Sequence, residues 1–212
     1  MWAMQLSVFM PLAKAWRNRV GLPRPLRLLG WYFPLSIVTV VTARMLAAHH
    51  LPNLYALIAF NASKTLLFGL VLRQVLPDRW AQGLSDTLLL LGLAAIGAAV
   101  VWLPMSTAIS VARLVQCVVL TVIALAYVEQ ASRLPTGRLG TNPYFWLCVG
   151  ELGYAAATVA VFGAGDSLYY AGLRIVVDMT MALAGLYQNY TLWQVYAQAP
   201  GLREHPATPR LP

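Results

Sequence analysis

Six long apolar runs dominate this sequence and determine the solvent in which it can fold. They cover residues 29–48, 54–76, 83–103, 106–128, 143–163 and 168–195. Each run reaches the roughly 18 apolar residues that a helix needs to cross a bilayer. Only 10% of the residues are charged, compared with about 25% in soluble domains. We therefore predict an all-α, polytopic integral membrane helix bundle with about six transmembrane helices.

The segments outside these runs are short and leave no room for a second folded domain. Residues 1–28 are expected to form a basic cytoplasmic segment with a helix lying at the membrane interface; a short extra span is the alternative. The basic residues follow the apolar stretch instead of preceding it, which argues against a cleaved signal peptide. The six-helix transmembrane domain takes residues 29–197, and the Pro-rich, polar residues 198–212 are expected to be a disordered cytoplasmic tail.

The distribution of Lys and Arg predicts the orientation of the chain. Eleven of them lie in the N-terminal segment, the connections between runs two and three and between runs four and five, and the C-terminal tail. An even number of spans places all of these segments on one side. The opposite connections have only Arg44, near the end of the first run. Basic loops face the cytoplasm, so both termini are expected inside, in a bacterial-type inner membrane. Topology thus explains the net charge of +8, and we expect the lipid bilayer, not nucleic acid, as the partner.

Three arginines lie inside the predicted spans at a similar depth. Counting about 1.5 Å per residue places Arg44, Arg113 and Arg174 in the outer third of the membrane. Ionisable residues inside spans are costly and suggest function, and guanidinium groups suit anionic ligands. We expect a cationic, outward-facing pocket for an anionic or amphiphilic ligand. The alternatives are that Arg44 and Arg174 extend to headgroups, or that Arg174 pairs with Asp178 four positions later.

A second set of polar residues lies near the middle of the membrane. Lys64 in the second run and Glu151 in the fifth are predicted to form a salt bridge, with Asp178 of the sixth run at a similar depth. Asn61 and Tyr154 each lie three positions from one of these charges and can share its helix face. This predicted buried charge network is either a structural lock or a site that binds protons or a ligand.

The sequence has no motif that identifies an enzyme or a cofactor site. The metalloprotease pattern H-E-x-x-H and the hydrolase pattern G-x-S-x-G are both missing. Four zinc ligands cannot be assembled from Cys117 and Cys148, which lie inside apolar runs, and the three histidines His49, His50 and His205. We therefore expect no catalytic residues, no metal and no cofactor, and the chain is more readily a binding protein than an enzyme.

These observations favour a non-catalytic, ligand-binding membrane protein. It would act as a sensor or as an accessory subunit of a larger membrane complex, with other membrane subunits or copies of itself as partners. The size and six-helix plan are similar to those of substrate-capturing subunits of modular vitamin importers, in topology only. The alternative is therefore a transporter component for a small anionic or aromatic solute, either such a subunit or a proton-coupled carrier; an enzyme acting on lipid headgroups ranks third.

Overall fold

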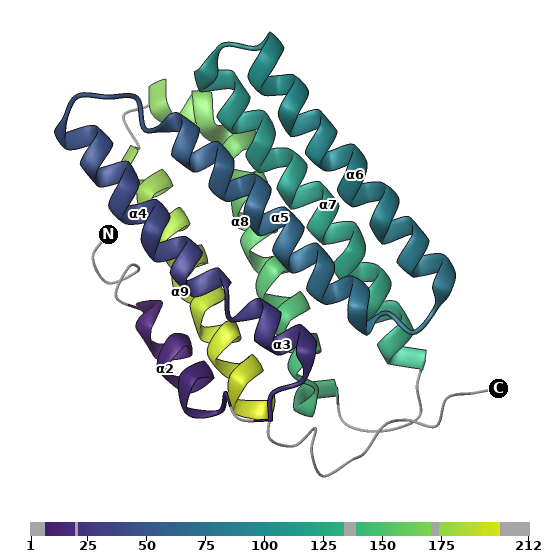
Figure 1. Cartoon of the computed structure of the whole chain (residues 1–212). Coiled ribbons are helices and arrows are strands. Elements are labelled where there is room, and N and C mark those ends of the chain that lie inside the picture. Colours follow the sequence, from purple (N-terminus) through teal and green to yellow (C-terminus); the bar gives the residue numbers. More distant parts are fainter. Residues whose placement is uncertain (1–6, 20, 134–138, 171–173, 200–212) are drawn as a thin grey trace.

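The computed structural model describes residues 7–19, 21–133, 139–170 and 174–199, with side chains for all of these except 163–174. These residues form helices and no strand, which confirms the predicted all-α class for the described part of the chain. The elements, in chain order, are α2 (Phe9–Arg17), α3 (Arg24–Leu29), α4 (Tyr32–Ala48), α5 (Leu54–Val75), α6 (Arg79–Trp102), α7 (Met105–Arg133), the short 3₁₀ helix η1 (Leu139–Thr141), α8 (Pro143–Tyr170) and α9 (Arg174–Gln198). Figure 1 shows the long helices running side by side along one common direction.

Five segments are long and apolar enough to cross a membrane. They are Arg24–Ala48, Leu54–Val75, Arg79–Trp102, Met105–Arg133 and Pro143–Phe162. The sixth predicted span corresponds to α9, which is 25 residues long but has Gln188, Asn189 and Gln194 in its second half. Those amides make α9 less hydrophobic than the other long helices. The predicted tail begins inside this element, and from residue 200 onward it lies outside the described residues.

Polar caps and prolines define the helix boundaries. The Asp78 side chain accepts a hydrogen bond of 3.0 Å from the backbone amide of Trp80 at the start of α6. The Asn142 side chain does the same for Tyr144 at 2.9 Å at the start of α8. Such caps satisfy amide groups that have no partner within the helix. Short connections join α4 to α5, α5 to α6 and α6 to α7, so these helices run back and forth along the bundle.

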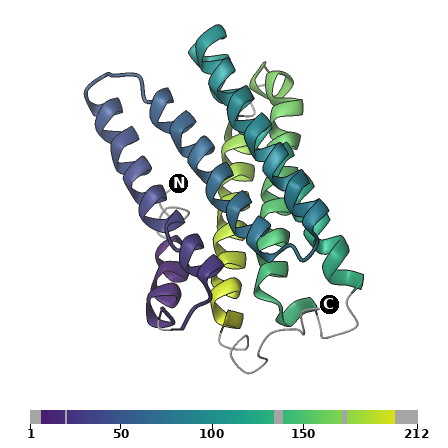
Figure 2. The same cartoon turned by 45° about the vertical axis from the view of Figure 1, so that its right-hand side comes forward.

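The long helices form an arc when the bundle is viewed along its axis. α4 packs on α5, α5 on α7, α7 on α8 and α8 on α9, while α6 covers the outside of α5 and α7. α4 and α9 are the two ends of this arc, and the described residues show no extensive packing between them. Figure 2 shows α4 set apart from α9 along its upper half. The backbones of α4 and α9 therefore do not close the arc against each other.

The N-terminal helices close the arc at one end of the bundle. α2 packs on α9 and α3 packs on α5. The Asn18 side-chain amide donates a hydrogen bond of 2.8 Å to the backbone oxygen of Tyr196. The Tyr196 hydroxyl donates one of 3.1 Å to the backbone oxygen of Leu26. α2 buries Pro11 and Ala15 against its neighbours and exposes Trp16. The helix predicted to lie on the membrane is thus also part of the bundle.

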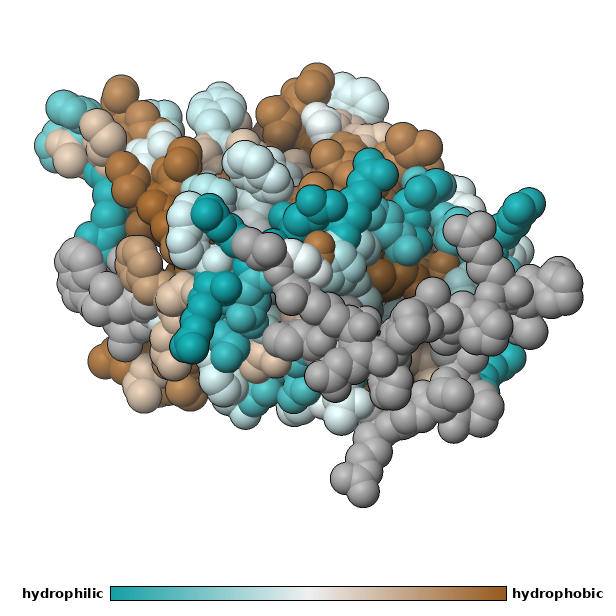
Figure 3. All heavy atoms as spheres, turned by 60° about the horizontal axis from the view of Figure 1, so that its bottom comes forward, coloured by the Kyte–Doolittle hydropathy of each residue, from teal (hydrophilic) through white to brown (hydrophobic). Residues whose placement is uncertain are grey.

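The same end of the bundle has most of the described basic residues. The described part of this end includes Lys14, Arg17, Arg19, Arg24, Arg27, Arg73, Arg79 and Arg133. Arg73 of α5 and Asp86 of α6 form a two-pronged ion pair with N–O distances of 2.5 and 2.9 Å. Figure 3, which brings this end forward, shows hydrophilic residues across it. We call it the basic end.

Two apolar clusters of unequal size fill the bundle. The larger lies toward the basic end and contains Phe33, Phe68, Leu72, Leu120, Ile123, Leu147, Leu192 and Tyr196 among others. The smaller, toward the opposite end, is built from Ile58, Ile96, Ala99, Ala108 and Ala112. Lys64 and Glu151 are buried between the two clusters. The packing thus leaves the middle of the arc to polar groups.

Close approach of α8 to α9 depends on small residues. A Cβ atom added at Gly150 would lie only 3.0 Å from the Cβ of Thr191 and even closer to its hydroxyl oxygen. One added at Gly153 would lie within 3.0 Å of the Tyr187 ring. Glycine therefore allows the two helices to pack at short distance.

We expect Gly150→Ala to lower the free energy of unfolding by about 1–3 kcal/mol, the usual cost of overpacking a filled interface. The measurement is the denaturation midpoint of the purified protein in detergent. Gly97→Ala is the matched control, because a Cβ at Gly97 of α6 meets nothing within 4 Å. The control should leave the midpoint unchanged or raise it slightly, since alanine favours helix. Equal destabilisation by both variants would contradict this account of the α8–α9 contact.

Candidate functional site

A buried ion pair joins two helices at the middle of the bundle. Lys64 lies near the midpoint of α5, and its Nζ is 3.4 Å from Oε1 of Glu151 on α8. The two side chains are only 2% and 3% exposed. α5 and α8 do not pack closely along their backbones in the described structure, so the long lysine side chain reaches across the interior of the arc. The structure therefore brings these two predicted network residues together.

Gln188 of α9 bridges the two charges. Lys64 Nζ donates a hydrogen bond of 3.2 Å to the Gln188 carbonyl oxygen. The Gln188 amide nitrogen in turn donates to the Glu151 carboxylate. The carbonyl dipole thus faces the cation and the amide hydrogens face the anion, which is the favourable orientation for both. Helices α5, α8 and α9 are connected through these three side chains, which we call the central triad.

Aromatic rings surround the lysine of the central triad. Its Nζ lies 4.1 Å from the ring centroid of Tyr154, 5.2 Å from that of Phe68 and 6.0 Å from that of Tyr32. The electron-rich faces of such rings attract a cation within about 6 Å. Burying a lone charge would cost several kcal/mol, and here the carboxylate, the amide and the rings together offset that cost.

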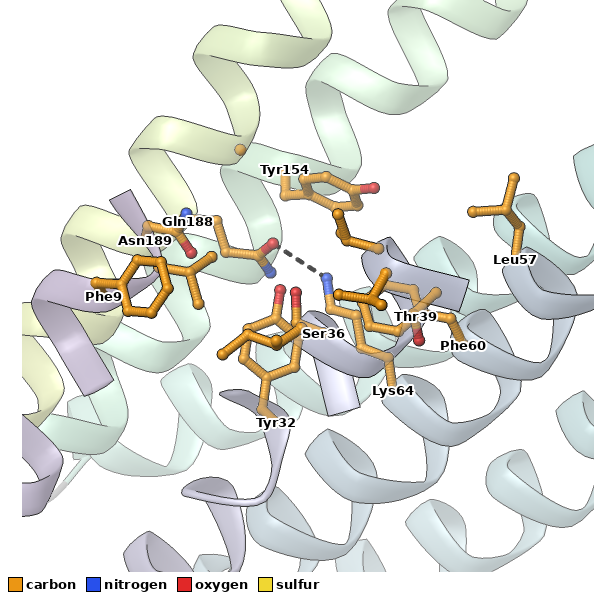
Figure 4. A pocket seen from close by; sticks show the side chains of 15 residues that line it. Phe9, Tyr32, Ser36, Thr39, Leu57, Phe60, Lys64, Tyr154, Gln188 and Asn189 are labelled. Carbon is orange, nitrogen blue, oxygen red and sulfur yellow. Dashed lines mark hydrogen bonds between the residues drawn. The ribbon is translucent and has the colours of Figure 1, made fainter. Parts of the chain in front are cut away.

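A cavity of about 310 Å³ lies next to the central triad, inside the arc. Its walls come from α2, α4, α5, α8 and α9, and Figure 4 shows the ends of the Lys64 and Gln188 side chains facing each other there. Most of the wall is apolar or aromatic, and the polar groups are few. The residues that line it are Val8, Phe9, Tyr32, Ser36, Ile37, Thr39, Val40, Val41, Leu57, Phe60, Lys64, Tyr154, Gly185, Gln188 and Asn189.

The cavity has wall residues on both α4 and α9, the two ends of the arc. α2 and α3 close the arc at the basic end, whereas α4 and α9 are separated above them. Lys64 is ten residues from the start of α5, about 15 Å along the helix axis. A molecule entering between α4 and α9 would therefore reach the central triad at roughly half the depth of an apolar bilayer core.

The arginines predicted to converge are not gathered in this cavity. Arg44 is exposed near the end of α4, and Arg113 extends from α7 with its guanidinium 5.5 Å from the ring centroid of Phe162. α5 lies between α4 and α7 (Figure 1), so the structure does not bring these two together. Arg174 begins α9, and its side chain lies outside the described residues. None of the three lines the cavity.

The other predicted network residues differ in their relation to the central triad. Tyr154 contacts Lys64 directly, and Asn61 is buried one turn away from it on α5. Asp178 is ten residues from Gln188 on α9, about 15 Å along the helix. Asp178 therefore lies too far along α9 to belong to the central triad. The prediction placed it at the depth of Lys64 because depths counted from the ends of a span can be wrong by several residues.

Gln188 is the residue of the central triad that the sequence analysis did not predict. It lies in the stretch from Tyr187 to Trp193, whose polar and aromatic residues are typical of a helix end at the membrane surface. In the structure Gln188, Asn189 and Thr191 are instead buried, while Tyr187 and Tyr190 are exposed. This alternation at helical spacing is the signal that could have identified a buried polar face.

Comparison with known proteins gives no independent guide to the site: no family model, curated protein or solved structure matches this chain. Within the described ranges, no three His, Cys, Asp or Glu side chains come close enough to hold a metal ion. The site thus consists of a buried cation and anion, an amide and several aromatic rings beside an apolar cavity. Such a site suits binding through hydrogen bonds and packing.

We expect Lys64→Met and Glu151→Leu each to lower the free energy of unfolding by about 3–5 kcal/mol, because each leaves an opposite charge buried without its partner. The double variant should be more stable than either single variant, since no lone charge remains. Denaturation in detergent, analysed as a double-mutant cycle, measures this coupling. Arg73→Met is the comparison: its ion pair with Asp86 is about two-fifths exposed, at 39% and 43%, and should shift the transition much less. If the double variant loses as much free energy of unfolding as the two single variants together, the pairing is contradicted.

Proposed function

We propose that this protein is a non-catalytic membrane protein that binds a lipid-soluble ligand in the cavity beside the central triad. The observation that carries the proposal is the combination of one polar cluster with an otherwise apolar cavity at mid-bilayer depth. Ligand sites are generally concave and mostly apolar, with a few polar groups that orient the ligand. A sensor or an accessory subunit of a membrane complex would use such a site.

The wall chemistry favours an amphiphile with an aromatic or branched apolar body. Phe9, Tyr32, Phe60 and Tyr154 provide ring faces, and aliphatic residues of α4 provide the remaining wall. Such surfaces gain most from contact with apolar groups and flat rings. A strongly hydrophilic solute would lose its hydration without replacement hydrogen bonds.

The charge balance of the site favours a neutral hydrogen-bond acceptor over an anion. The charges of Lys64 and Glu151 cancel, so an added anion would leave the buried site with a net charge. The ammonium group has three N–H donors, and Glu151 and Gln188 provide acceptors for two of them. A carbonyl, ether or hydroxyl oxygen of the ligand would take the third.

We further propose that α9 crosses the bilayer as a sixth span, with both termini in the cytoplasm. This topology places the basic end inside, in accordance with the distribution of Lys and Arg. The 25 residues of α9 give about 37 Å of helix, enough for the apolar core of a bilayer. Its buried amides have partners inside the bundle: Gln188 belongs to the central triad and Asn189 donates a hydrogen bond to Ser7, so few of them would meet lipid. An inner membrane of bacterial type is the location that fits this plan.

Transport of the same ligand is the second candidate function. It is favoured by the depth of the cavity, because carriers commonly bind their substrates near the bilayer midplane. In that case the buried Glu151 would couple ligand movement to protons. Flux of a ligand into proteoliposomes, lost in Glu151→Gln, would distinguish a carrier from a receptor.

The binding proposal is testable with benzophenone, a lipid-soluble diaryl ketone that crosslinks to nearby C–H bonds on illumination. We expect peptide mass spectrometry of the purified protein to locate crosslinks on cavity residues such as Val40, Leu57 and Phe60. Ser36→Trp, which fills the cavity, should reduce labelling several-fold. Val118→Trp adds the same side chain to the exposed face of α7, where Val118 is 59% exposed, and should leave labelling of the cavity unchanged.

Two competitors of the same shape test the requirement for an acceptor oxygen. Fluorenone has a carbonyl and fluorene does not. At equal membrane concentration, fluorenone should suppress the crosslink at a roughly tenfold lower concentration, as a hydrogen bond to a charged donor contributes about 1.5–3 kcal/mol. Labelling spread evenly over lipid-facing residues, or unchanged in Ser36→Trp, would refute binding in the cavity.

A further inference from the structure

A second polar region lies on the α7 side of the central triad, away from the cavity. Four buried side-chain atoms there have no hydrogen-bond partner among the described residues: Asn61 Nδ2, Arg113 Nε, Gln116 Oε1 and Thr158 Oγ1. Asn61, Gln116 and Thr158 are at most 4% exposed. We call these four residues the polar layer.

Helical spacing places the polar layer beside the central triad and toward the end of the bundle opposite the basic end. Asn61 precedes Lys64 by one turn on α5, and Thr158 follows Glu151 by two turns on α8, so both are nearer that end than the triad. On α7, which starts at Met105, Gln116 is about level with Lys64, and Arg113 is nearly one turn closer to that end.

Cys117 links the polar layer to the central triad. Cys117 directly follows Gln116 on α7, and it lies beside the Thr158 side chain and near Lys64 and Glu151. α7 packs on both α5 and α8, so one residue of α7 can be near groups on both helices. The polar layer and the triad therefore belong to one continuous polar region.

Leaving these atoms unpaired would be expensive. Each buried donor or acceptor without a partner costs about 1–3 kcal/mol, and native proteins leave few such groups. The layer offers donors at Asn61 and Arg113, an acceptor at Gln116 and a hydroxyl at Thr158 that can do both. Water matches this mixture, because it donates and accepts, whereas an anion would be repelled by the acceptor.

We propose that the polar layer is an internal water-binding site that lets the buried groups beside it, including the central triad, exchange hydrogen with water. Buried waters typically make about three hydrogen bonds to otherwise unsatisfied groups. The groups around Glu151 come from α4, α5, α7, α8 and α9: they are Tyr32, Lys64, Cys117, Cys148 and Gln188. This site is separate from the ligand cavity and does not depend on what occupies it.

The two native cysteines provide the test. Cys117 adjoins the polar layer, whereas Cys148 lies in the larger apolar cluster, and both are buried, at 2% and 0% exposure. The full-length protein is transferred from H₂O to D₂O in detergent, and the loss of each S–H stretching band is followed by infrared spectroscopy. Cys117→Ala and Cys148→Ala assign the two bands.

We expect the Cys117 thiol to exchange at least tenfold faster than the Cys148 thiol, although neither is exposed. The double variant Gln116→Leu with Thr158→Val should slow Cys117 toward the rate of Cys148. Ser85→Ala, which removes a buried unpartnered hydroxyl on α6 outside the layer, should change neither rate. Equal rates for the two thiols in the unmodified protein would overturn the proposal, and this comparison does not require any variant of the layer to fold.

Discussion

The burial of one lysine in the middle of α5 is the constraint on which the interior depends. An ammonium group at that depth needs an opposite charge and acceptors within reach. Glu151 and Gln188 supply them from two further helices, and aromatic rings cover the remaining directions. Because these partners come from α8 and α9, the lysine fixes how the first and last parts of the chain meet.

The arc of helices gives this interaction its setting. In a closed bundle the space beside Lys64 would be filled by another helix, and the charges would serve only as a structural lock. Here α5 is the one long helix against which α4 packs extensively in the described residues. The space inside the arc remains a cavity. The same side chains that hold the bundle together therefore also form the polar part of the cavity wall, where we propose that a ligand binds.

The sequence predicted the features that depend on one helix at a time. Apolar runs predicted the long helices, and the position of Lys64 and Glu151 within their runs placed both charges at one level. The arrangement of helices around the bundle axis could not be predicted in this way. Arg44 and Arg113 share a depth but lie on helices to either side of α5, and the separation of α4 from α9 has no signature in either helix.

The separation of α4 from α9 would give lipid a role in the proposed binding. In a bilayer, acyl chains would lie against this side of the bundle, since the hydrocarbon core contains no water to do so. An occupant that enters the cavity from this side would then displace lipid instead of solvent. The quantity that governs occupancy is then the mole fraction of the ligand in the membrane, and the same molecule at one aqueous concentration would fill the site to different extents in bilayers that dissolve it differently.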